Sequence, residues 1–494
     1  MSSGELLLGV DVGTTSARAA LFDANGSMLA SSGVSYETSH PRPGWAEQHP
    51  YEIQAAVEAA VRRVSANRGE QVAGCALAST AVSVVTVDAS GEAIGPVILW
   101  MDTRASKEAA EINARNHPAL RYTGGSVSPE WMLPKALWLK RNDPERYHQT
   151  AYLVEIHDWL VHRWTGQWVL SLPTVCAEWS YVPELGGWPV ELLEAVGLKD
   201  VIEKWPNDIL HAGEAVGGLT AEAAAATKLP EGLPLSQGLM DSYAAACACD
   251  VFSPGRLSLS LGSSSCYLAV TKRPIFDERL LGPVAGAFGP SRWIVQGGQT
   301  SAASTLDWFV RHLAPGRTYR YLDEEAELLP PGSEGVWAMD TFQGCRTPHR
   351  DPASRGAFGG LNLSHGRAHL YRSLLEAVAY GGRQIVEVMG QCGVVASSIT
   401  ACGGGARSPL WMQIHADVLG RPVSVIDQTE PAALGAALSA GVGIGIYPNL
   451  ETGTTAAYRI AHTYDPRPEV AEAYAQGYRR YLRTYSALHP NLLN

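Results

Sequence analysis

The sequence of 494 residues lacks several features that would assign it at once to a class of protein. No stretch reaches the roughly 18 uninterrupted apolar residues that a membrane-spanning helix needs, and the small-residue run at 431–447 is too rich in glycine to serve as one. An excess of positive charge is also missing, because the formal net charge is -11. No basic field is therefore available to attract a nucleic acid. We expect neither a membrane nor a nucleic acid as a partner.

The eight cysteines form no recognisable metal-binding or redox pattern. No Cys-x-x-Cys pair occurs, and no cysteine lies at zinc-site spacing from histidines. Scattered thiols of this kind are typical of a reducing compartment. The chain opens with no basic segment ahead of its short apolar run, so a signal peptide is not predicted. We expect a cytoplasmic protein.

Length and an internal repeat predict two domains. A single hydrophobic core stops growing at about 250–300 residues, and the chain is longer than that. The segments that begin at Leu6 and at Leu257 each alternate apolar residues before and after a short polar turn, which predicts an antiparallel hairpin near the start of each half. We assign the domains to residues 1–250 and 251–494.

Each predicted hairpin turn combines a glycine with hydroxyl side chains. The residues are Gly13, Thr14, Thr15, Gly262, Ser263 and Ser264. Glycine permits close backbone approach, and hydroxyls with free N–H groups can hold phosphate oxygens without a positive surface. The same residue types are ordinary in turns, but a pair of such turns, each with an acid nearby, favours phosphate binding. The usual P-loop pattern, G-x-x-x-x-G-K-[ST], is absent.

Two acidic residues are candidates for chemistry. Asp11 precedes the first turn on a strand, where Mg²⁺ bound to nucleotide phosphates would provide a partner for an inward carboxylate; the alternative is a solvent-facing Asp at a strand end. Asp241 opens the run "DSYAAACACD", which predicts a tightly packed helix. Asp241 is either the N-cap of this helix or an acid that the helix dipole keeps ionised to accept a substrate proton.

Two further segments have the pattern of strand, turn and helix. In "CGGGARSPL", from Cys402, the glycines remove side chains from one surface, which suits a flat ring, although an ordinary turn explains them equally well. Ser408 and Pro409 are expected as the N-cap and first residue of a helix. The helix predicted at 366–390 has the apolar spacing of a core helix, so its Glu376 is only a minor functional candidate.

Seven segments, in order along residues 6–447, resemble the FGGY carbohydrate kinases, which are related to hexokinase and actin. They include "GVDVGTTSARAALFD", "WMDTRA", "GLMDSYAAA" and "GGGARSPLWMQIHAD", and residues 356–376 follow the C-terminal signature of the family almost position by position. The resemblance implies an α/β protein with a duplicated ribonuclease H-like fold of the actin/hexokinase ATPase type. Its two domains would enclose a central cleft, with sugar on the N-terminal side and ATP on the C-terminal side.

The resemblance also implies residue roles. Asp241 matches the general base that accepts the proton of a sugar hydroxyl as that oxygen attacks the γ-phosphorus of ATP. Asp11 corresponds to the magnesium-associated acid, so ATP and Mg²⁺ are the expected cofactors. The residues expected on the two phosphate turns are Gly13, Thr14, Thr15, Gly262, Ser263 and Ser264, and those at the adenosine site are Gly404, Gly405 and Ser408.

Sugar specificity is expected in the N-terminal half. Trp100, Asp102 and Arg104 of "WMDTRA" are the expected sugar contacts, with a surface turn held by an Asp–Arg ion pair as the alternative. Residues 76–88 lack the Arg-Glu pair of glycerol kinases and the Gln-Met-His of bacterial xylulokinases. Other segments resemble the ribulokinase branch, which adds Glu130 and Asp158 as candidates for contacting sugar hydroxyls or shaping the pocket.

We therefore predict phosphorylation of a ketopentose of the ribulose type. A xylulokinase or another polyol or ketose kinase is an alternative, since "GCRTPH" is as similar to the xylulokinase loop. An actin-like or chaperone-like ATP-driven binding module would not need Asp241 or "WMDTRA". A catalytically silent sugar sensor would have lost Asp241 or Asp11, and both are present. The oligomeric state is left open, with a homodimer among the alternatives.

Overall fold

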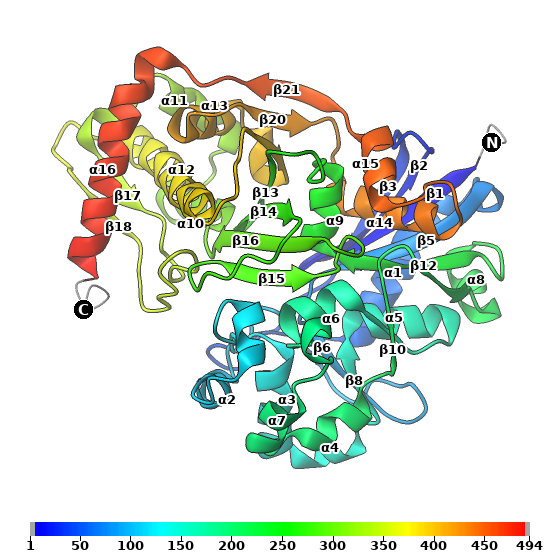
Figure 1. Ribbon diagram of the computed structural model, residues 1–494. Helices are drawn as coiled ribbons and strands as arrows, with labels where there is room; N and C mark the ends of the chain where they lie inside the picture. Colours follow the sequence, from blue (N-terminus) through cyan, green and yellow to red (C-terminus); the bar gives the residue numbers. More distant parts are fainter. Residues whose placement is uncertain (1–4, 490–494) are drawn as a thin grey trace.

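The computed structural model describes residues 5–489, which form two α/β halves, each built on one large sheet (Figure 1). The first sheet has six strands in the order β11-β12-β5-β1-β2-β3. Its strands are β1 (Leu6–Val12), β2 (Ser16–Phe22), β3 (Met28–Ser35), β5 (Val72–Ser79), β11 (Ala215–Gly218) and β12 (Pro234–Met240). β5 runs parallel to β1 and to β12, whereas the other pairs are antiparallel.

The second sheet has seven strands in the order β15-β16-β14-β13-β19-β20-β21. Its strands are β13 (Arg256–Leu261), β14 (Ser265–Thr271), β15 (Leu281–Ala285), β16 (Trp293–Gln299), β19 (Ser398–Cys402), β20 (Val423–Ile426) and β21 (Ile460–Tyr464). β19 is parallel to β13 and to β20, and the remaining pairs are antiparallel. Apart from β15, each strand has a counterpart of the same direction in the first sheet, which confirms the predicted duplication.

Both predicted hairpins are present at equivalent places. β1 and β2 are joined through residues 13–15, and β13 and β14 through residues 262–264. The expected alternation holds less well for β1, because all seven of its residues are buried. A strand in the interior of a sheet, with neighbours on both sides and helices packed on it, becomes a continuous apolar run.

Helices cover the two sheets. Those of the first half are α1 (Pro50–Ser65), α2 (Ser106–Asn113), α3 (Met132–Asn142), α4 (Pro144–Gln149), α5 (Ile156–Thr165), α6 (Leu172–Glu178), α7 (Val190–Ala195), α8 (Ala221–Thr227) and α9 (Asp241–Ala248). Those of the second half are α10 (Ala303–Leu313), α11 (Tyr319–Glu327), α12 (Arg367–Gln391), α13 (Pro409–Leu419), α14 (Pro431–Gly443), α15 (Leu450–Ala457) and α16 (Ala471–Leu488). α12 is the predicted core helix. No helix among residues 5–489 is long and apolar enough to cross a membrane.

Small strands complete the fold. β4 (Glu47–Gln48), β6 (Val84–Val87), β7 (Val97–Ile98) and β8 (Tyr152–Glu155) form a four-stranded sheet. β9 (Val169–Ser171) pairs with β10 (Asp208–Leu210), and β17 (Trp337–Met339) pairs with β18 (Ala357–Gly359). The four-stranded sheet and helices α2–α7 gather on one side of the first half (Figure 1). This layer carries the residues predicted to bind sugar.

The chain returns from the second half to pack on the first sheet. α14 lies against β1, β5 and β12 and crosses α9. A Cβ on Gly9 would lie 1.8 Å from the carbonyl oxygen of Ala433, and one on Gly435 would lie 2.1 Å from that of Ala244. Only glycine permits these approaches. Residues of α14 and α15 therefore belong to the core of the first half in space, although they follow the predicted boundary at 250 along the chain.

Candidate active site

Asp241 lies at the carboxyl end of β12, where it is the first residue of α9. Met240 occupies the N-cap position, so the N-cap alternative for Asp241 is wrong. Its Oδ1 accepts a hydrogen bond from the N–H of Ser242 at 2.6 Å. Burial raises the pKa of Asp241 to about 6, against the lowering effect of that bond. The helix end therefore does not cancel the cost of burial, and the resulting pKa is close to that of an effective general base near neutral pH.

Asp11 lies at the same edge of the first sheet. β1, β5 and β12 are parallel, so their carboxyl ends meet there. Asp11 is only 8% exposed, which excludes the solvent-facing alternative. Its Oδ1 is buried and has no hydrogen-bond partner among the described residues. Burial and the negative charge of Asp241 raise the pKa of Asp11 to about 7. An unpartnered carboxylate oxygen beside a second carboxylate fits a hard divalent cation such as Mg²⁺.

In each of the two predicted phosphate turns, the N–H of the glycine closes the turn. Gly13 donates its N–H to the carbonyl of Ser16 at 3.0 Å, and Gly262 donates to that of Ser264 at 3.0 Å. The residues at the tips, Thr15 and Ser263, are exposed. The turns thus present backbone and hydroxyl groups outward from equivalent positions in the two halves.

The predicted adenosine segment is a turn between β19 and α13. Ser408 caps α13 by accepting a hydrogen bond from the N–H of Trp411 at 3.1 Å, and Pro409 is the first helical residue, as predicted. A Cβ on Gly405 would lie 2.7 Å from side-chain atoms of Leu261 and Trp411, whereas Gly404 has open space beside it. Gly405 is therefore required for packing, and Gly404 supplies the bare backbone surface.

Hydrogen bonds from other parts of the first half hold the "WMDTRA" segment in place. Trp100 donates its Nε1–H to Thr14 Oγ1 at 3.0 Å and so joins this segment to the first phosphate turn. Asp102 is fully buried at 0% exposure and accepts hydrogen bonds from the Ala46 N–H at 2.7 Å and from Arg104 Nε at 2.9 Å and Nη2 at 2.7 Å. Arg104 also pairs with Glu47 at 2.7 Å.

This geometry corrects the expected roles of Asp102 and Arg104. Both oxygens of Asp102 are occupied by protein donors, and the side chain of Arg104 is only 2% exposed. The ion-pair alternative is therefore present, although in buried form. The pair holds the loop that carries Trp100 and leaves no free oxygen of Asp102 for a sugar hydroxyl.

The two remaining sugar candidates differ in position. Asp158 is 2% exposed, and its Oδ2 accepts the N–H of Glu155 at 3.1 Å in a capping box of α5. This role fits the shaping of the pocket. Glu130 accepts a hydrogen bond from Ser128 Oγ at 3.1 Å and lies 3.9 Å from Arg346 of the second half. Glu130 therefore stands where the two halves meet.

Two residues at this junction were missed from the sequence. Arg346 belongs to the "GCRTPH" loop, which was noted only as a family segment. Glu178 ends α6, and its Oε2 is buried without a hydrogen-bond partner in the described residues. Burial, with the charges of Glu155 and Glu130, raises the pKa of Glu178 well above its usual value, while Arg346 acts in the opposite direction. No local pattern in "CAEWS" signals such a carboxylate.

The halves touch beside these residues. Arg350 Nη1 of the second half donates to Ser126 Oγ of the first at 2.7 Å. A cavity of about 570 Å³ lies between the halves. Its lining comes from the start of α6, from residues around β10 and from the turn between β15 and β16. Its lining includes neither Asp11 nor Asp241, so this cavity is distinct from the candidate site.

Comparison with known families decides the assignment. The model of the N-terminal domain of the FGGY family of carbohydrate kinases matches residues 6–248, and the model of its C-terminal domain matches residues 257–444. The chain belongs to the FGGY family of carbohydrate kinases. It is therefore a sugar kinase that uses ATP, as predicted, and the reading as an actin-like binding module is set aside.

The relatives of this FGGY kinase align with almost its whole length. It is 30% identical over 528 residues to an FGGY carbohydrate kinase domain-containing protein of Xenopus laevis, covering 97% of this chain and 96% of that protein. It is 30% identical over 526 residues to a ribulokinase of Mycolicibacterium smegmatis, covering 97% and 93%. The crystal structure of a xylulose kinase from Rhodospirillum rubrum superposes with a TM-score of 0.86 at 30% identity, covering 99% and 100%. These similarities confirm the predicted fold.

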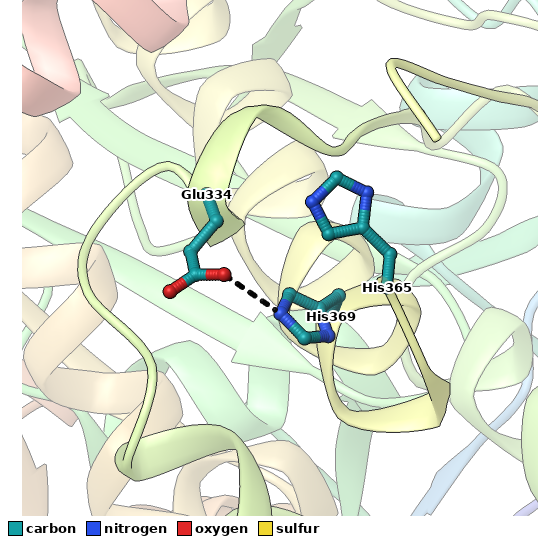
Figure 2. Close-up of side chains that lie close together, drawn as sticks. All are labelled: Glu334, His365 and His369. Atoms are coloured by element: carbon teal, nitrogen blue, oxygen red, sulfur yellow. Dashed lines mark hydrogen bonds and ion pairs between the residues drawn. The ribbon is translucent and has the colours of Figure 1, made fainter. Parts of the chain in front are cut away.

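The FGGY kinase also contains a group of potential metal ligands at the start of α12 (Figure 2). Ligand atoms of Glu334, His365 and His369 lie within 4.8 Å of one another, the only such group of three or more among residues 5–489. His365 Nδ1 accepts the N–H of Asn362 at 3.1 Å, and His369 Nδ1 accepts that of Gly366 at 3.1 Å. Both rings therefore carry their proton on Nε2, and that of His369 points to Glu334 at 3.2 Å.

This hydrogen bonding favours helix capping over metal binding. A histidine that binds a metal through Nε2 must carry its proton on Nδ1, where it donates to an acceptor. Here each Nδ1 faces a backbone donor instead. His369 thus satisfies a free N–H at the start of α12.

Proposed function

We propose that this kinase phosphorylates a ketopentose of the ribulose type, with Asp241 as the general base. The observation that carries the proposal is the pair of carboxylates at one edge of the first sheet, the buried Asp11 and the half-buried Asp241, which are close enough for the charge of Asp241 to raise the pKa of Asp11. Relatives at about the same identity are named ribulokinase and xylulose kinase. Both names refer to enzymes that act on ketopentoses, which supports this substrate class.

The geometry supports in-line phosphoryl transfer. Asp241 Oδ1 is held by the Ser242 N–H, which leaves Oδ2 to accept the proton of the attacking sugar hydroxyl. That hydroxyl oxygen forms the new bond to the γ-phosphorus, and the bond from this phosphorus to the oxygen bridging to the β-phosphate breaks to release ADP. Within this scheme, the turns of Thr14 and Thr15 and of Ser263 and Ser264 hold the phosphates.

Asp11 is the residue that would hold Mg²⁺. The donor is a buried carboxylate oxygen without a protein partner, which is the ligand type that this cation prefers. Mg²⁺ bound there would neutralise charge on the phosphates as they are transferred. Gly404 and the cap of Ser408 remain the proposed adenosine surface, with Gly405 supporting it through packing.

Charge at the junction favours a neutral substrate over a sugar acid. Arg346 lies 3.9 Å from Glu130, and Lys135 donates to the carbonyls of Val82 and Leu99, so both cations that act on Glu178 already have partners. An anionic substrate would have to compete with these partners, whereas the hydroxyls of a neutral sugar can hydrogen-bond to Glu178 whether its carboxyl is ionised or protonated. A ketopentose has the required hydroxyls and no charge.

The test is ADP release from Mg-ATP with a panel of D-ribulose, L-ribulose, D-xylulose, L-xylulose, erythrulose, ribitol and glycerol. We expect turnover with a ketopentose, and a loss of about 100- to 10,000-fold in kcat for Asp241→Asn with the KM for ATP unchanged. Asp200→Asn, which changes a surface carboxylate paired with Lys140, is the matched control. Preferred turnover of ribitol or glycerol would contradict the ketopentose proposal, and full activity of Asp241→Asn would contradict the base.

A further inference from the structure

The turn that follows β5 contains a strained residue. Val82 has a φ of 49°, a left-handed conformation that a β-branched side chain rarely adopts. The strand β5 lies between β1 and β12, and its last residue, Ser79, is in register with Val12 and with Met240. Residues 80–83 therefore leave the sheet between Asp11 and Asp241. Strain of this kind persists only where the surroundings enforce it.

Two buried ionisable side chains hold Val82 in this left-handed conformation. Glu155 Oε2 accepts the N–H of Val82 at 2.9 Å, and Lys135 Nζ donates to the carbonyl of Val82 at 2.7 Å. Glu155 is 1% exposed and Lys135 is 0% exposed. Both polar groups of one backbone residue are thus held by ionisable side chains from β8 and α3. We call this arrangement the Lys135–Glu155 clamp.

Burying the two ionisable groups of the clamp costs free energy, so a contribution to stability does not explain why they are there. Burial raises the pKa of Glu155 to about 7 and lowers that of Lys135 to about 8, because each charge has lost its water. Apolar side chains of similar volume would avoid this cost. The retained charges do one thing that apolar groups cannot do, since they bind a specific backbone N–H and a specific carbonyl.

The same side chains fix two other segments on the sugar side. Lys135 Nζ also donates to the carbonyl of Leu99 at 2.7 Å, directly before Trp100. Glu155 Oε1 accepts the Nε1–H of Trp179 at 2.6 Å, directly after Glu178. The turn at 80–83, the Trp100 segment and the end of α6 are therefore held to one another. Of residues 80–83, only Ala81 is not buried.

We propose that the Lys135–Glu155 clamp is a specificity device, which holds Val82 in its left-handed conformation so that Ala81 forms the floor of the sugar site between Asp11 and Asp241. The position of this floor sets which sugar can present a hydroxyl to Asp241. The inference rests on the proposed function. Lys135 and Glu155 are positioning residues, because their contacts are to the backbone and to Trp179.

The test uses V82G, K135M and the double variant V82G/K135M. Glycine adopts a φ near 49° without strain, so the turn in the V82G background needs the clamp less. We expect K135M alone to lower kcat/KM for the preferred sugar about 100-fold, since misplacement by about 1 Å has effects of that size. The KM for ATP should stay unchanged, and discrimination between ketopentoses should fall. In the V82G background the same K135M change should cost at most about tenfold.

A smaller effect of K135M in the V82G background would distinguish a positioning role of Lys135 from a merely structural one. Equal losses for K135M in both backgrounds, with unchanged discrimination among sugars, would overturn the clamp as a specificity device. E155Q serves if K135M does not fold, because the amide keeps the volume of the side chain and one acceptor oxygen; its losses should likewise shrink in the V82G background. The substrate is whichever panel sugar the unmodified enzyme turns over. A preference for a polyol would therefore refute the ketopentose proposal while leaving the clamp test intact.

Discussion

The ionisation of Asp241 should be visible in the pH dependence of the reaction. Burial raises its pKa to about 6, and the base works only when deprotonated, so the rate falls as the solution becomes more acidic. A group with that pKa is about one-tenth ionised at pH 5. We therefore expect kcat/KM for the sugar to fall about tenfold between its plateau above pH 7 and pH 5.

Asp11 determines how steeply kcat/KM falls on the acidic side of this pH profile, its acidic limb. Its pKa is raised to about 7 by burial and by the charge of Asp241. Saturating Mg²⁺ would keep Asp11 deprotonated, so one proton should govern the limb. At low Mg²⁺ the neighbouring carboxyl also takes up a proton as pH falls, and the limb should steepen and move to higher pH, because the pair then titrates together.

The assay is quenched ADP release from pH 4.5 to 8.5, with the sugar below its KM, at high and low Mg²⁺. Circular dichroism at each pH excludes unfolding as the cause of any loss. A kcat/KM that stays constant from pH 7 to pH 5 in a folded enzyme would refute the assignment of the base. A limb that does not respond to Mg²⁺ would refute the role of Asp11.

Four further outcomes are expected. Asp11→Asn should abolish the Mg²⁺ response yet raise the free energy of unfolding at pH 8 by on the order of 4 kcal/mol, because it removes a buried charge. Since the native pKa of Asp11 is raised, this gain in stability should shrink as pH falls from about 7 to about 4, and a gain that grows toward acid would contradict the reasoning. Asp102→Asn should destabilise the fold by about 2–5 kcal/mol, because the buried Arg104 loses its fully buried carboxylate partner and keeps only Glu47. Denaturant unfolding checks this loss of stability, and a raised sugar KM with unchanged stability would restore the direct contact of Asp102 with sugar. Gly435→Ala should lower thermal stability and activity together, because its Cβ would meet the Ala244 carbonyl of α9, whereas Gly404→Ala has open space and should change only the KM for ATP. His369→Ala should lower stability by about 0.5–2 kcal/mol through the lost cap, and isothermal titration with Zn²⁺ should give no binding that this variant removes.

Local patterns in the sequence predicted much of the scaffold. The two hairpins, the glycine turn before α13, the Ser408 cap and α12 each follow from residues within about 25 positions of one another. Hydrogen bonds and apolar periodicity at that range follow directly from the order of the side chains along the chain. The resemblance to the family pointed to Asp11 and Asp241 as site residues, and the parallel strands explain why the two share an edge.

The tertiary structure decided how the other site residues act. Asp102 looked free because Ala46, which donates its N–H to it, lies 56 positions away along the chain. The left-handed turn at Val82 likewise depends on Lys135, 53 positions away. Sequence patterns report which faces are apolar, but a buried polar atom is satisfied by whichever donor the packing brings to it. Whether a carboxylate is occupied or available therefore follows from long-range contacts, while the strands and turns that carry it follow from local ones.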